Sequence, residues 1–167
     1  MSTLSRKFLG FQQFTGSGTW VKRPGVRAVL VMCIGGGRGT SGNGGSSSFS
    51  TCVGTGGGTS QAGTSGTGGD LNLTSGMSLI EPALLTYGPG CNVFGFNGTG
   101  VSNLTGQANT GIASGYGTTA VKTSGGAAMK LFLAQDLPDT VAVTVGAGGS
   151  GSAPAAQAGQ VWIFEVS

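Results

Sequence analysis

Histidine is absent from this 167-residue chain, and charged residues make up only 8% of it. Without histidine, acid–base catalysis would depend on carboxylates, and serine or threonine nucleophiles would have no imidazole to activate them. The acids of the chain are Asp70, Glu81, Asp136, Asp139 and Glu165. Cleavage of glycosidic bonds by a pair of carboxylates is the catalytic alternative that they leave open. We expect a protein that is not an enzyme.

Cysteine is scarce as well: Cys33, Cys52 and Cys91 are the three in the chain. Their number is odd, and no two of them have the C-x-x-C spacing that is typical of metal or redox sites. We therefore expect three free thiols, with Cys33 a small buried hydrophobe, and neither a metal nor a cofactor.

One glycine motif mimics a nucleotide site. Residues Gly146–Gly151 fit G-x-G-x-x-G after a strand, and Glu165 follows at the end of another strand. Dinucleotide binding would need a helix between them, whose N-terminus faces the pyrophosphate. The available segment contains Pro154 and Gly159, which disfavour a helix, so we interpret the motif as a glycine turn between strands.

Long apolar runs are also missing. No segment approaches the roughly 20 apolar residues of a membrane span, and no apolar signal-peptide core follows Arg6 and Lys7. We therefore expect that the protein is made in a cytoplasm and does not insert into a membrane. The length fits a single domain, residues 1–167.

Glycine is the abundant residue, at 36 positions, most of them between Gly35 and Gly126. So much glycine is often a sign of disorder, but the low charge and the positive mean hydropathy argue against it. We expect core strands in residues 1–34 and 127–167 and a glycine-rich loop region at 35–126. Alternatively, these glycines could pack as layers of polyproline-II-like chain, although no strict period of three is present.

Patterns of β-branched and apolar residues predict strands, and no helical period exceeds about ten residues. The predicted strands lie at 8–14, 26–34, 46–53, 71–73, 129–133, 141–145 and 161–166. We expect an all-β fold of seven or eight strands, a β-sandwich of jelly-roll type with long glycine-rich loops. The residues predicted to be largely buried are Val29, Leu30, Val31, Val143, Val145, Val161 and Ile163.

Most basic residues lie in the first 38 positions, and no acid precedes Asp70. A basic end can meet an acidic partner, or it can dock on another protein. No recognition helix or aromatic–basic pattern accompanies the charge, so we do not expect nucleic acid binding. The residues expected at a docking face are Arg6, Lys7, Lys22 and Arg23.

Five motifs together resemble the glycine-rich domain of bacteriophage tail fibres and related virion proteins. Residues 14–20 read FTGSGTW, and Pro24-Gly25-Val26 leads into a strand that ends in Gly35-Gly36-Gly37. Three further motifs follow in the family's order, SSFS at 47–50, GGDLNL at 68–73 and VTVGAGG at 143–149. The chain departs from the family at residues 77–104, which form a distinct insertion, and we expect no fibre shaft before the domain.

This resemblance implies a virion surface protein, a tail fibre or receptor-binding adhesin that contacts the host cell through glycine-rich loops. The alternative is a purely structural virion component, such as a head fibre, a decoration protein or a tail-tip protein. Its implied partners are other virion proteins, a bacterial surface glycan or outer-membrane protein, and further copies of itself, most simply a trimer. Its implied location is the virion, after synthesis in the host bacterial cytoplasm.

Aromatic residues among small ones can supply contact area for a receptor. The alternative is that these rings fill small cores beneath long loops. Phe49 is expected to be such a core residue. The candidates for receptor contact are Tyr87, Phe94, Phe96 and Tyr116.

Overall fold

The computed structural model describes residues 7–39, 41–58, 65–74, 90–91, 97–98, 125–151 and 156–167. This part of the chain is nearly all β, and its strands form antiparallel sheets, which confirms the predicted all-β class. The strands are β1 (Phe8–Phe14), β2 (Gly18–Val21), β3 (Ala28–Ile34), β4 (Ser47–Phe49), β5 (Cys52–Gly54), β6 (Leu71–Leu73), β7 (Gly90–Cys91), β8 (Asn97–Gly98), β9 (Ala127–Leu133), β10 (Thr140–Thr144) and β11 (Gln160–Val166). A short 3₁₀ helix, η2 (Ala134–Asp136), joins β9 to β10.

The strands form two main sheets. A five-stranded sheet has the order β1-β11-β3-β9-β6, and a four-stranded sheet has the order β2-β10-β4-β5. Strands β7 and β8 pair with each other in a separate two-stranded sheet. The central strand β3 pairs along its whole length with β11 on one side and β9 on the other, and all its residues except the half-buried Leu30 are buried, as its continuous apolar sequence predicts.

Both main sheets contribute side chains to one core. Val29, Val31 and Ile163 come from the five-stranded sheet, and Trp20 and Phe49 come from the four-stranded sheet. The rings of Trp20 and Phe49 meet edge to face with centroids 5.6 Å apart. Period-two alternation explains this arrangement, since every second residue of each strand faces the opposite sheet.

Most of the predicted core residues are buried. Val29, Val31, Val143, Val161 and Ile163 are at most 2% exposed, as expected. Two others are only half-buried: Leu30 points to the outer face of its sheet by strand alternation, and Val145 lies just beyond the end of β10.

The predicted strand at 46–53 is two strands. Strands β4 and β5 form a tight hairpin whose turn is Ser50-Thr51, and Ser50 adopts a positive φ of 51°. A non-glycine residue rarely adopts this conformation, so the weak turn signal of serine and threonine does not predict it. Strands β4 to β6 all arise from the region expected to form glycine-rich loops.

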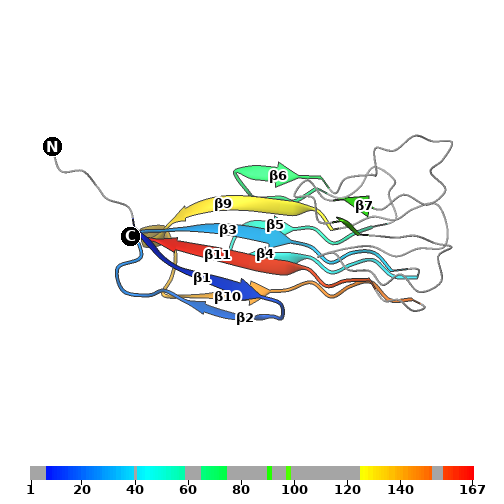
Figure 1. Cartoon of the computed structure of the whole chain (residues 1–167), viewed down its shortest axis with the longest axis horizontal. Helices are drawn as coiled ribbons and strands as arrows, with labels where there is room; N and C mark the ends of the chain where they lie inside the picture. Colours follow the sequence, from blue (N-terminus) through cyan, green and yellow to red (C-terminus); the bar gives the residue numbers. More distant parts are fainter. Residues whose placement is uncertain are drawn as a thin grey trace.

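The molecule is elongated and has two different ends (Figure 1). Strands β3, β5 and β10 run toward one end and continue there as extended glycine-rich segments, whereas β9 and β11 return from it. Lys7 and Ser167 lie together at the other end, where the Lys7 amide donates to the Ser167 hydroxyl and the Ser167 amide donates to the Lys7 carbonyl. We call the end with the glycine-rich segments the glycine end, and the end with Lys7 and Ser167 the base. Among the residues described, no helix is long and apolar enough to cross a membrane.

Candidate functional site

The glycine end is built from segments that leave the strands and hydrogen-bond to one another. We call them together the glycine layer, and they comprise residues 35–39, 41–46, 55–58, 125–126, 145–151 and 156–159. Three of these segments bond in a closed triangle, since Gly36 donates to Gly45, Gly44 donates to Gly57, and Gly57 donates to Gly36. A β-ladder has neighbours on two sides in one plane, so this triangle is not part of a sheet.

The first segment occupies the middle of the layer. The backbone N–H groups of Gly35, Gly36 and Gly37 donate to three different neighbours, the carbonyls of Gly126, Gly45 and Gln157. The carbonyl groups of Gly36 and Gly37 accept hydrogen bonds from the N–H groups of Gly57 and Gly149, which lie in two further segments. Successive N–H groups that point to three different sides are the pattern of a polyproline-II chain, which has three residues per turn. These residues therefore fit the alternative of layered polyproline-II-like packing better than they fit irregular loops.

The layer requires glycine because neighbouring backbones lie too close together to leave room for a side chain. A Cβ atom on Gly35 would clash with the carbonyl of Thr55, one on Gly36 with the carbonyl of Ala147, and one on Gly44 with the carbonyl of Gly36. None of these three residues has a positive φ, so left-handed geometry is not the reason for glycine. The fixed carbonyl groups of the neighbouring chains leave no room for a side chain.

The surface that the layer offers is rich in small polar groups and carries the charge of the half-buried Arg38. Ser41, Asn43, Ser150 and Gln157 are exposed there. Ser41 is held in place, because its amide and its hydroxyl both donate to the Ser150 carbonyl. Hydroxyl, amide and peptide groups held on a firmly bonded backbone are suited to hydrogen-bonding a neutral polar ligand such as a glycan.

The four predicted receptor-contact residues, Tyr87, Phe94, Phe96 and Tyr116, lie outside the described residues. The structure does place Phe49, which is fully buried between Trp20 and Phe132. Phe49 is thus a core residue, as predicted.

Three of the four predicted docking residues are described, and all three lie at the base (Figure 1). Lys22 has partners within the chain, because its ammonium donates to the carbonyls of Ala134 and Leu137 and pairs with Asp139 at 3.3 Å. Lys7 is exposed. Arg6 lies outside the described residues. Docking by these residues remains a prediction.

Arg23 belongs to a polar network around a buried carboxylate. Glu165 is fully buried; its Oε1 accepts hydrogen bonds from Trp20 Nε1 at 2.8 Å and from Gln12 Nε2 at 3.0 Å. The Arg23 Nε atom lies 3.4 Å from Glu165 Oε2 and supplies the balancing charge. The network joins β1, β2 and β11, and therefore ties the two sheets together at one edge. In the sequence, Glu165 appeared among the five acids and at the end of the G-x-G-x-x-G pattern, and neither observation predicted a buried network.

Cys33 and Cys52 are free thiols, and both are fully buried in the shared core. The side-chain hydrogen bond to Cys52 and burial both raise the pKa of Cys33. The same hydrogen bond lowers the pKa of Cys52, so the protection expected for Cys52 rests on its burial, whereas Cys33 is both buried and protonated.

We expect these two thiols to be protected from a water-soluble thiol reagent in the native protein. The test is the number of thiols labelled before and after unfolding in guanidinium, with Cys33→Ala and Cys52→Ala variants to assign them. All three cysteines should react after unfolding. Native labelling of Cys33 or Cys52 as fast as in the unfolded chain would contradict the prediction.

No group of three or more histidine, cysteine or acidic side chains comes together in the described ranges. After the Gly146–Gly151 motif, residues 156–159 are not helical and lead directly into β11. Comparisons of the chain with protein-family models, with curated proteins and with solved structures found no match.

Proposed function

We propose that this chain is a bacteriophage virion surface protein that contacts the host cell through its glycine end and is carried by other virion proteins at its base. The observation that carries the proposal is the polarity of the molecule. The glycine layer lies at the end opposite to Lys7 and Ser167, so a neighbour attached to the base leaves the layer free (Figure 1). The resemblance of the sequence motifs to phage fibre domains supports the same assignment.

The proposed mechanism is recognition without catalysis. The strands and the hydrogen-bonded glycine segments hold small polar groups in fixed positions, which lowers the entropy lost on binding. Single contacts of this kind are weak, and display of many copies on one particle would convert them into useful avidity. The proposed ligand is a bacterial surface glycan or an outer-membrane protein.

A purely structural role in the virion is the second candidate function. It is favoured by the hydrophobic side chains that are exposed on the outer face of the five-stranded sheet, since such surfaces often mark protein interfaces. Head fibre, decoration and tail-tip proteins all fit this description.

Binding of the labelled, purified chain to bacterial cells separates the two functions. The adhesin function predicts saturable binding to host cells and competition with phage adsorption. Replacing Tyr87, Phe94, Phe96 and Tyr116 together by alanine should weaken this binding by about tenfold or more. The control is Val21→Ser, which changes an exposed residue of β2 far from the glycine layer. Absence of both binding and competition, for a chain that antibodies still locate on the particle, would support the structural role.

A further inference from the structure

Two buried cysteines lie between the sheets, and the proposed function does not use them. Cys33 is on β3 of the five-stranded sheet, and Cys52 is the first residue of β5 in the four-stranded sheet. Both are fully buried in the core that the two sheets share. A bond between their sulfur atoms would therefore join the two sheets covalently.

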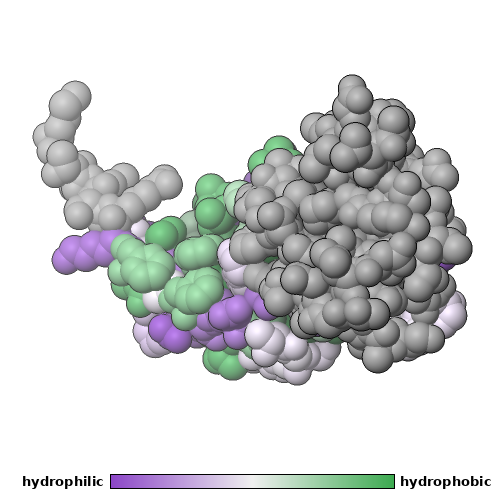
Figure 2. Space-filling view, turned by 45° about the vertical axis from the view of Figure 1, so that its right-hand side comes forward, coloured by the Kyte–Doolittle hydropathy of each residue, from purple (hydrophilic) through white to green (hydrophobic). Residues whose placement is uncertain are grey.

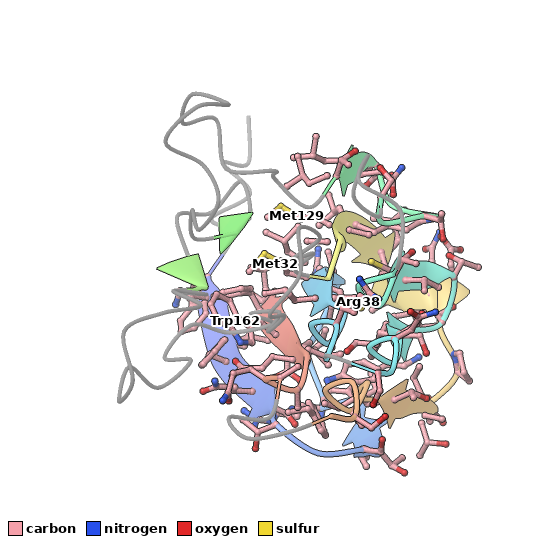
Figure 3. All side chains as sticks on the ribbon, turned by 90° about the vertical axis from the view of Figure 1, so that its right-hand side faces the viewer. Met32, Arg38, Met129 and Trp162 are labelled. Atoms are coloured by element: carbon pink, nitrogen blue, oxygen red, sulfur yellow. The ribbon has the colours of Figure 1, made fainter. Side chains whose placement is uncertain are left out.

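The two faces of β3 have different surroundings. Met32 points to the outer face of its sheet, where it packs with Met129 and Trp162 (Figure 3). Toward the base, the same outer face exposes hydrophobic side chains, and Figure 2 shows hydrophobic surface at that end of the molecule. Because successive side chains of a strand point to opposite faces, Cys33 points inward, toward the four-stranded sheet.

Strand β5 brings Cys52 to Cys33. A Cβ atom on Gly54 would clash with the carbonyl of Cys33, and one on Gly35 would clash with the carbonyl of Thr55, so the two backbones are in contact. Gly54 thus faces β3, and Cys52, two residues earlier on the same strand, faces the same way. The side chains of Cys33 and Cys52 hydrogen-bond to each other. Disulfide formation would shorten a contact that already exists.

Of the two thiols, Cys52 is the nearer to solvent along the chain. It directly follows the hairpin turn Ser50-Thr51, whose residues are both exposed. Cys33 lies within the central strand, between β9 and β11. Hydrogen peroxide is small and uncharged, so brief opening of the hairpin admits it more readily than a bulkier thiol reagent.

The hydrogen bond also assigns different roles to the two sulfur atoms. The bond from Cys33 and the nearby charge of Lys130 lower the pKa of Cys52, whereas the same bond and burial raise the pKa of Cys33. The thiolate is the attacking species in thiol chemistry. Cys52 is therefore the sulfur that reacts first, and Cys33 is the neighbouring thiol that reacts with the intermediate.

We propose that Cys33 and Cys52 are a modification site, at which a peroxide forms a disulfide bond between the two sheets. In the first step, the Cys52 sulfur attacks one oxygen of hydrogen peroxide and the O–O bond breaks. Cys52 becomes a sulfenic acid, and the leaving hydroxide takes the proton of the Cys52 thiol to form water. In the second step, the Cys33 sulfur attacks the Cys52 sulfur and displaces hydroxide, which takes the Cys33 proton to form a second water. The two thiols together lose the two electrons that reduce the peroxide.

This chemistry would make the domain more stable after it leaves the cell. Thiols stay reduced in a cytoplasm, and the structure describes the reduced form, with both cysteines free. Outside the cell, oxidation would tie β3 to the β4–β5 hairpin, next to the glycine layer. A cross-link lowers the conformational entropy of the unfolded chain and so favours the folded one. The inference does not depend on receptor binding, because it concerns the purified chain alone.

The first test identifies the bonded pair. The full chain is purified with a reductant, freed of it, treated with hydrogen peroxide while folded, and then alkylated in denaturant and digested. Cleavage after Arg38 and before Asp70 places the three cysteines on three separate peptides. We expect mass spectrometry to find Cys33 joined to Cys52, with Cys91 outside the bond. Two thiols that stay free, or that become sulfinic acids without a disulfide, would overturn the proposal.

The fold, and not chance, should select this pair. The same chain oxidised in guanidinium should give mixed pairs that include Cys91, whereas the folded chain should give Cys33 with Cys52 in clear excess. The same mixture of pairs from the folded and the unfolded chain would overturn the proposal.

The second test measures the effect on stability. In a Cys91→Ser chain, oxidation should raise the midpoint of guanidinium unfolding by about 0.5 M or more above that of the same chain kept reduced. The control is Cys52→Ala in the same background, which should show no rise after the same treatment and which also accounts for methionine oxidation. Cys33→Ala replaces this control if Cys52→Ala folds poorly. A disulfide that leaves the midpoint unchanged or lowers it would contradict the proposed stabilisation.

Discussion

Gly36→Ala is expected to lower the free energy of unfolding by about 3 kcal/mol or more, or to prevent folding altogether. The added methyl group would clash with the carbonyl of Ala147 and approach the carbonyl oxygen of Gly146 to 3.0 Å. Both belong to a backbone that is held by hydrogen bonds, since Gly45 donates to Ala147 and Gly159 donates to Gly146. The neighbouring chain therefore cannot move away without breaking further bonds of the layer.

Guanidinium denaturation of the purified chain, followed by tryptophan fluorescence, measures this effect. Gly16→Ala is the matched control, because a Cβ atom on Gly16 would have no atom within 4 Å. That substitution should change the free energy of unfolding by less than about 0.5 kcal/mol or raise it slightly. Equal stabilities of the two variants would show that the glycine layer does not depend on close backbone approach.

Glu165→Ala is expected to cost about 3 to 5 kcal/mol of unfolding free energy. The substitution removes the acceptor of the Trp20 indole N–H in the core and the partner of Arg23, and it leaves a cavity between the sheets. Glu165→Gln keeps an oxygen that can accept from Trp20, so it should cost less than half as much. Arg23 is half-exposed, and water can solvate its charge in both variants.

Asp136→Ala is the control for loss of an acid at an exposed position, and it should be nearly neutral. Thermal and guanidinium unfolding of the three variants can be compared directly. If Glu165→Ala were no less stable than Asp136→Ala, the buried network would have no structural importance.

The strands of this protein are largely predictable, because burial selects β-branched and apolar residues with a clear period. Strands β1, β3, β6, β9, β10 and β11 all fall where that pattern places them. The hairpin at Ser50 was hard to predict, since serine is only a weak turn signal and a positive φ is rare for a residue other than glycine. Glu165 occupies an inward position of β11, yet no local pattern could identify Trp20 and Gln12 as its partners.

The glycine layer was harder to predict for a different reason. A periodic sequence specifies a layer built from one repeated chain, whereas here the partners of Gly35, Gly36 and Gly37 come from separate segments, at Gly126, Gly45 and Gln157. Each segment is short, so no strict period of three can develop. The identities of the residues that would contact a receptor were inferred from composition alone, and they lie outside the described residues.

The polarity of the molecule also determines how it would carry a mechanical load. A pull between the base and the glycine end acts along the strands, whereas the hydrogen bonds of the antiparallel ladders lie across them. Such a pull loads the bonds of β3 with β9 and β11 in shear, so many must break together. A pull that separates Lys7 from Ser167 would instead peel β1 from β11 one pair at a time. The domain would thus resist a pull along the strands, the direction in which a bound cell would pull it. It would resist less well a pull that separates β1 from β11 at the base.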